Sequence, residues 1–323
     1  MLDRDERKFV LQRIFIPLDA GAALEPLTSA EQLVRGGFAT IAATFRRNLQ
    51  AVLSTAAVPF RLVSAAVQQV RWQALMSAEL IRSQTLVEGG MTETEAERVA
   101  AGIAQTKLDK ELQSEASVFG DRILHNLRGA LDDPEFAEGA SELLRQCTVL
   151  TWSALEVVAQ EIFVGVLNTR PSLVSRLSAD ESAKRLFPLK SIAIEALIEY
   201  EFDLSRHIGD LLAQLRAVDS VPVMKTAFYA LFPGADKLRV ALGDTALWAL
   251  NQRRHLILHK RGVVDREYLE KTGEDLQAGQ QLAITASELE AYMLAVVGVG
   301  SELLISAAGS SGESLADTVS PSS

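Results

Sequence analysis

Apolar residues recur at helical spacing along nearly the whole chain, and this pattern constrains the fold more than any other feature of the sequence. The pattern is clearest in residues 141–168, where its apolar members include Leu144, Leu150, Leu155, Val158, Ile162 and Val166. Only residues 281–284 have the character of a short extended segment. Because 48% of the residues are hydrophobic, there is ample material for a packed core. We therefore expect an all-α protein.

Capping residues and helix breakers divide this pattern into separate helices. A Ser or Thr followed three residues later by Glu or Gln predicts helix starts at Ser29, Thr92 and Thr285. Pro59 is expected to kink or break the long Ala-rich segment that follows Ser29, and Gly89 begins the Gly-Gly pair expected to end it.

The second half carries similar signals. A helix is expected from Ile192 to Ala217, before a connection that prolines break into short pieces. Asp244 is the predicted N-cap of a helix over residues 245–261, and Gly262 stands where that helix should stop.

A turn signal at Asp132-Asp133-Pro134 suggests the domain organisation. Residues 1–135 would form an N-terminal helical region and residues 136–308 a second helical domain. The tail, residues 309–323, is rich in Ser, Gly and Asp, and we expect it to be disordered.

The overall charge argues against a protein whose whole surface holds nucleic acid. The formal net charge is −10, whereas such proteins are normally basic. Any RNA contact must therefore come from a local basic patch or from a partner.

The remaining composition favours a cytoplasmic protein. The single cysteine, Cys147, cannot form an internal disulfide and is expected in the core of a protein in a reducing compartment. No signal-type apolar stretch follows the charged N-terminal residues. Two apolar regions, 38–70 and 289–308, contain charged residues and are expected to be buried helices rather than membrane spans of about 20 uncharged residues.

The strongest candidate for chemistry is the run Arg-Arg-His-Leu-Ile-Leu-His-Lys-Arg at residues 253–261, an isolated basic spot in an acidic chain. It holds two of the four histidines. Cations near a helix C-terminus are also favoured by the helix dipole, and this alone could account for Lys260 and Arg261.

Helical geometry sorts these residues onto different faces. At about 100° per residue, Trp248, Gln252, His255 and His259 share one face. Arg254 falls instead in the sector predicted to be apolar, with Leu247, Leu250, Ile257 and Leu258. An arginine in such a sector needs a carboxylate or a phosphate as its partner.

Geometry by itself does not join these groups into one site. On an ideal helix Arg254 and His259 point about 140° apart. His255 and His259 could supply two ligands to a metal, but a third is not evident, so no metal site is expected. A phosphate-binding glycine loop is also absent, which argues against an NTPase.

The stretch Arg254-His255-Leu-Ile-Leu-His259 resembles the R-x4-6-H motif of the HEPN superfamily (higher eukaryotes and prokaryotes nucleotide-binding). The following Gly262-Val-Val-Asp265 and the earlier Trp152-Ser-Ala-Leu-Glu156 are also similar to the surroundings of that motif. The resemblance covers roughly residues 140–305. It implies a HEPN-like bundle of roughly four or five helices in residues 136–308, which pairs as a homodimer with a composite cleft.

The resemblance also implies an activity, which is metal-independent endoribonuclease cleavage of RNA by attack of the ribose 2′-OH. Such an activity would serve in stress response or phage defence. His259 would act as general base or acid, Arg254 would hold the phosphate, and His255 would bind the phosphate or orient His259. From the helix pattern, Glu156 is the candidate to hold Arg254, and the flanking cations Arg253, Lys260 and Arg261 would contact RNA. No cofactor is expected.

Two further alternatives stay open at this stage. A non-catalytic HEPN-type scaffold that binds RNA or protein would fit the same motif. Residues 1–135 resemble nothing known to us, and they would restrain the nuclease, extend the dimer or bind a regulatory protein.

Overall fold

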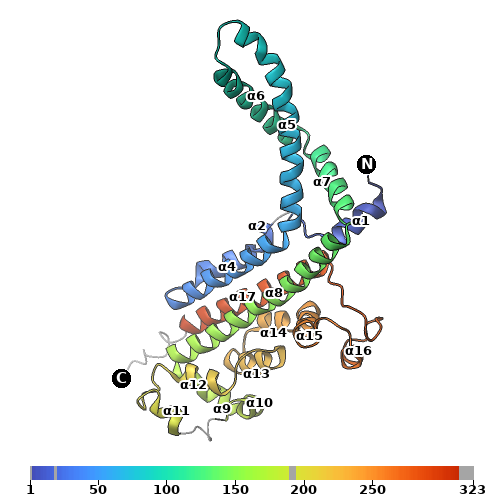
Figure 1. The fold of residues 1–323 in the computed structure, drawn as a ribbon. Coiled ribbons are helices and arrows are strands. Elements are labelled where there is room, and N and C mark those ends of the chain that lie inside the picture. Colours follow the sequence, from blue (N-terminus) through green and yellow to red (C-terminus); the bar gives the residue numbers. More distant parts are fainter. Residues whose placement is uncertain (1, 18–19, 189–193, 313–323) are drawn as a thin grey trace. The chain divides into compact units, whose positions relative to one another are not determined.

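The computed structural model describes residues 2–17, 20–188 and 194–312 (Figure 1). These residues are helical almost throughout and contain one isolated antiparallel bridge, between Val263 and Gln281, and no named strand. The predicted all-α class is therefore confirmed, and the bridge lies where a short extended segment was expected.

The chain divides into two compact units that do not follow a single cut at residue 135. Unit 1 comprises Met1–Ile16, Ala56–Leu144 and Thr285–Ser287, and unit 2 comprises Pro17–Thr55, Arg145–Ile284 and Glu288–Ser323. The predicted turn before Pro134 is present between two helices of unit 1. Residues 17–55, which were expected with the N-terminal region, belong to the unit that carries the candidate site.

Unit 1 is built on a helical hairpin. Its elements are α1 (Arg4–Arg13), α5 (Val58–Glu88), α6 (Glu93–Ser114), α7 (Ala116–Ala130) and the first turns of α8 (Pro134–Thr169). Gly90, with φ +101°, lies in the turn after α5, and Thr92 and Glu95 form the predicted capping box of α6. Arg71 on α5 donates to both carboxylate oxygens of Glu111 on α6, at 2.8 and 2.6 Å.

The apolar core of unit 1 lies where α1, α7 and the first turns of α8 meet. Its buried members are Val10, Ile14, Ile123, Leu127, Leu131 and Ala140. These residues fall on single faces of their helices, so the burial follows from helical amphipathicity.

Unit 2 is a helical assembly around one long apolar core. Its elements are α2 (Ala20–Ala23), α3 (Glu25–Leu33), α4 (Gly37–Ala56), the rest of α8, a 3-10 turn (Pro171–Leu173), α9 (Val174–Ala179), α10 (Glu181–Leu186), α11 (Ile194–Ile198), α12 (Ile208–Leu215), α13 (Val221–Leu231), α14 (Asp236–Leu242), α15 (Thr245–Lys260), α16 (Arg266–Thr272) and α17 (Ala286–Gly312). Cys147 is buried in it, as expected.

Helix α4 packs directly on both α8 and α17. A Cβ at Gly165 of α8 would lie 3.2 Å from the Phe38 ring, and one at Gly300 of α17 would lie 2.2 Å from the Phe45 ring. The glycines thus let the two α4 aromatics approach the helix backbones, and Phe45 is fully buried. Figure 1 shows the three helices running along one another.

Some predicted helix boundaries are confirmed and others are wrong. The chain breaks before Pro59, because α4 ends at Ala56 and α5 begins at Val58 with Pro59 in its first turn. Ser29 does not begin a helix, because α3 already starts at Glu25 with a proline in its first turn. The tail prediction was wrong for residues 309–312, which continue α17, and residues 313–323 lie outside the described residues.

The single helix predicted from Ile192 to Ala217 was also wrong. The described part of this segment contains two short helices, α11 and α12. Between them Glu201 and Phe202 adopt positive φ, and the Asp203 carboxylate accepts a hydrogen bond from the Ser205 backbone N–H at 2.9 Å. This local turn competes with helix continuation.

Among the described residues, two helices are long and apolar enough to cross a membrane by length and composition alone: α8 and Ala286–Gly309 of α17. The bent pair α4–α5 would add a third if it were one span. In the apolar windows of α8 and α17, 50% and 61% of the residues are buried within the fold, so packing accounts for much of this apolarity. The charged residues in 38–70 and 289–308 were expected to exclude membrane spans, but they do not exclude them by length and composition. The cytoplasmic location therefore stays a prediction.

The α4–α17 contact provides a test of the packing. We expect Gly300→Ala to lower the free energy of unfolding by about 1–3 kcal/mol, because the new methyl group overlaps the buried Phe45 ring. Gly298→Ala, in the same helix, has open space around its Cβ and should be neutral or stabilising by up to about 1 kcal/mol. Urea unfolding of both variants measures the difference; equal stabilities would contradict the described packing.

Candidate functional site

The candidate site lies on α15, whose two ends are fixed by local hydrogen bonds. Asp244 caps the first turn as predicted, its carboxylate accepting from the Ala246 N–H at 2.7 Å. The helix ends before Gly262, as predicted, through left-handed residues at Arg261 (φ +53°) and Gly262 (φ +74°).

The chain after α15 is held by a short antiparallel pairing. The Leu282 N–H donates to the Gly262 carbonyl at 2.8 Å, and the Val264 N–H donates to the Gln280 carbonyl at 2.9 Å. The Gln281 side chain donates to the Arg261 carbonyl at 2.9 Å. These bonds fix the direction in which the basic end of α15 is presented.

The buried face of α15 is rotated from the one predicted. Leu247, Leu250 and Ile257 are buried as expected. Leu258, however, is 48% exposed, and Leu256 is buried in its place. The buried sector therefore turns toward Arg253, and the opposite, exposed face carries Trp248, His255 and His259.

His255 and His259 form a close pair on that exposed face. Their ring centroids are 4.5 Å apart and the rings are tilted by 45°. Partial burial, followed by the neighbouring charge of His259, lowers the pKa of His255 from its ordinary value. This environment favours a neutral His255 imidazole at physiological pH, which is the form that accepts a proton.

Arg254 lies beside Glu156, the residue expected to hold it. Arg254 Nη2 donates to Glu156 Oε2 at 3.4 Å, and the same oxygen accepts from Trp152 Nε1 at 3.1 Å. The guanidinium also lies 5.9 Å from the Trp152 ring. Since this ion pair is long and 24% of the Arg254 side chain is exposed, the guanidinium retains N–H donors for another anion.

Arg253 is the most deeply placed cation of the group. Only 11% of its side chain is exposed, and Nη1 pairs with Glu288 at 2.5 Å while Nη2 pairs with Glu274 at 3.2 Å. Tyr292 and Tyr268 are buried beside it, and burial raises the pKa of Tyr268 to about 12, which keeps its phenol neutral. These contacts hold the Arg253 side chain in the interior, where its charge is paired with two carboxylates. The sequence had suggested instead that Arg253 contacts RNA.

Lys260 and Arg261 lie at the exposed end of α15. The Lys260 ammonium is 3.6 Å from the Asp265 carboxylate and is half exposed. Arg261 occupies the left-handed C-cap position with an exposed side chain. Both cations are accessible to an anion that approaches the histidine pair.

The structure thus forms two neighbouring groups on α15 rather than one complete site. One is the histidine pair, and the other is Arg254 with Glu156. Within the described part of the chain, no hydrogen bond, ion pair or ring contact joins the two groups. This agrees with the divergence of about 140° expected between Arg254 and His259 on one helix.

Sequence reasoning missed the residues that surround Arg253. Glu274 comes from the segment after α16, Tyr268 from α16 and Tyr292 from α17, and no local pattern links them to α15. Glu288 was recognised only as part of a helix start. The Trp152–Glu156 bond, in contrast, follows from i,i+4 spacing and could have been predicted.

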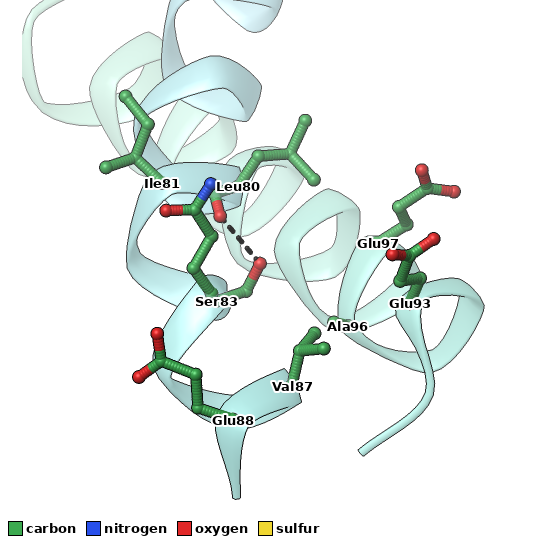
Figure 2. Close-up of a pocket in the computed structure, with 9 residues that line it drawn as sticks. Leu80, Ile81, Ser83, Val87, Glu88, Glu93, Ala96 and Glu97 are labelled. Carbon is green, nitrogen blue, oxygen red and sulfur yellow. Dashed lines mark hydrogen bonds between the residues drawn. The ribbon is translucent and has the colours of Figure 1, made fainter. Parts of the chain in front are cut away.

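A surface pocket lies in unit 1, near the turn of the α5–α6 hairpin (Figure 2). It has a volume of about 430 Å³ and is lined by Leu80, Ile81, Ser83, Gln84, Val87, Glu88, Glu93, Ala96 and Glu97. Its charged lining residues are all carboxylates, which suits it poorly to a phosphate. Among the described residues there is also no group of three or more His, Cys, Asp or Glu side chains placed to hold a metal ion.

In comparisons with known proteins, the chain matches no family model, no curated protein and no solved structure.

The Arg253 ion pairs provide a test of how α15 is anchored. We expect Arg253→Met to lower the free energy of unfolding by about 1–4 kcal/mol, since it removes the buried guanidinium that pairs with two partly buried carboxylates. Lys271→Met, which removes an exposed pair with Glu267, should cost at most about 0.5 kcal/mol. Denaturant unfolding at one ionic strength compares them; a Lys271→Met effect as large as that of Arg253→Met would contradict the anchoring role.

Proposed function

We propose that this protein is a metal-independent endoribonuclease of HEPN type. The observation that carries the proposal is the exposed His255–His259 pair, with rings 4.5 Å apart at the basic end of α15, near an arginine whose side chain is partly exposed. Paired imidazoles and a guanidinium are a sufficient set for phosphodiester transfer without a metal ion.

The chemistry would proceed by attack of the ribose 2′-oxygen on the adjacent phosphorus. One imidazole takes the 2′-OH proton while the O2′–P bond forms and the P–O5′ bond breaks. The other imidazole gives a proton to the leaving 5′-oxygen. The products are a 2′,3′-cyclic phosphate and a 5′-hydroxyl, and the lowered pKa of His255 suits it to the role of base, with His259 as acid.

Arg254 would stabilise the charge that builds on the phosphate oxygens. Its planar guanidinium presents parallel N–H groups to an oxyanion, and Glu156 orients it. Lys260 and Arg261 would attract the RNA backbone to this end of α15, which offsets the repulsion expected from a chain of net charge −10. Arg253 is left out of this RNA-binding set because its charge is already paired.

A homodimer is part of the proposal. Arg254 and the histidine pair diverge on one helix, so a second copy that faces α15 would supply the complementary groups across a composite cleft. We place this assembly in the cytoplasm, with RNA as substrate, and a role in stress response or phage defence would need a regulatory partner.

A non-catalytic RNA- or protein-binding scaffold is the second candidate. The observation in its favour is that Arg254 is already paired with Glu156 in the single chain rather than directed toward the imidazoles. Arg254 would make the same ion pair with Glu156 if its role were only to hold α15 against α8.

A regulatory role would belong to unit 1 and not to residues 1–135 as a block. Helix α4 belongs to unit 2, and its Phe45 is part of that core, so a cut at residue 135 would damage the catalytic unit. Unit 1 offers an α5 surface with Leu62, Val70 and Ile81 each more than 60% exposed, and a regulatory protein would contact this surface.

The proposal is tested by cleavage of a labelled single-stranded RNA in the presence of EDTA. We expect the wild-type chain to cut, His259→Ala to lose about 100-fold or more, and Arg254→Ala about 100- to 1,000-fold. His125→Ala, which removes a histidine of α7, is the matched control and should retain full activity. Activity that disappears with EDTA, or that survives both site substitutions, would refute the mechanism.

A further inference from the structure

The exposed face of α15 carries an indole that the proposed chemistry does not use. Trp248 is 40% exposed, although tryptophan is among the residues that bury most surface in folded proteins. On the helix it lies about 20° from the directions of both His255 and His259. The three side chains therefore form one continuous line along the surface of the helix.

The spacing along this line matches a strand of RNA. Trp248 precedes His255 by seven positions, a rise of about 10 Å at 1.5 Å per residue. That distance corresponds to about three stacked nucleotides, at about 3.4 Å each, and to fewer in an extended strand. A phosphate at the imidazoles would thus place a nearby base of the same strand at the indole.

The side chains around Trp248 suit a nucleobase. The half-buried amides of Asn251 and Gln252 lie on the same side of the helix, between the indole and His255, and both can donate to and accept from a base edge. Neither amide makes a side-chain hydrogen bond within the described part of the chain. Trp152, the aromatic side chain beside Arg254, is fully buried and bonded to Glu156, so it cannot serve this purpose.

We propose that Trp248 is a base-stacking residue that restricts the substrate to RNA unpaired near the cleaved bond. A base can stack on the indole only when it is out of a duplex, because its faces are covered within one. The inference rests on the proposed ribonuclease function and specifies its substrate class.

Binding is measured separately from cleavage in a His259→Ala background, with fluorescence anisotropy of a fluorescein-labelled single-stranded RNA and of a fully paired RNA hairpin. We expect Trp248→Ala to weaken binding of the single strand about 5- to 150-fold and to leave the hairpin unchanged. Trp248→Phe should retain most of the affinity. Leu258→Ala, which removes a similarly exposed apolar side chain about 80° around the helix, is the matched control and should have no effect.

The outcomes separate this inference from the function on which it rests. If the wild-type chain cuts RNA but Trp248→Ala binds the single strand as tightly as its parent, the stacking role is refuted and the nuclease stands. If Trp248→Ala instead halves the mass in light scattering without changing RNA affinity, the indole belongs to a contact between copies and the inference is overturned. If the wild-type chain neither binds nor cuts RNA, the proposed function fails and the stacking role with it.

Discussion

The ion pairs of Arg253 with Glu274 and Glu288 determine how α15 is presented, and the candidate site depends on that presentation. An arginine side chain that is only 11% exposed is stable in the interior only if carboxylates pair with its guanidinium. Here one carboxylate comes from the segment after α16 and the other from the first turn of α17. Since Arg253 and His255 lie about 160° apart on the helix, anchoring the first directs the second to solvent.

The neighbouring arginine experiences a different environment. Arg254 is a quarter exposed, contacts one carboxylate at 3.4 Å and lies near the face of an indole. Two adjacent arginines thus differ because three elements surround Arg253, whereas the ion pair and the ring contact of Arg254 are both with α8. Arg253 is therefore a structural cation, whereas Arg254 keeps N–H donors that are free to bind an anion. This difference underlies our proposal that Arg254 contacts phosphate.

The sequence was sufficient to predict the helical class, the start and end of α15, and the need of Arg254 for an anionic partner, for which Glu156 was the candidate. Each of these depends on local signals, such as the Asp244 cap and Gly262, or on an arginine that needed a carboxylate. The rotation of α15 was not predictable, because Leu256 and Leu258 are chemically alike and only packing with distant helices decides which one is buried. The same holds for α4, which joins unit 2 through contacts of Phe38 and Phe45 with α8 and α17 that no local pattern encodes.

The central proposal, that α15 carries an RNA-cleaving site driven by the ribose 2′-hydroxyl, is tested most directly with one oligonucleotide. The substrate is a DNA strand that contains a single ribonucleotide, and mass spectrometry of the products identifies the broken bond and its termini. We predict cleavage only on the 3′ side of that ribonucleotide, with a 2′,3′-cyclic phosphate on one product and a 5′-hydroxyl on the other. Cleavage at deoxyribonucleotides, or a product with a 5′-phosphate, would contradict the account.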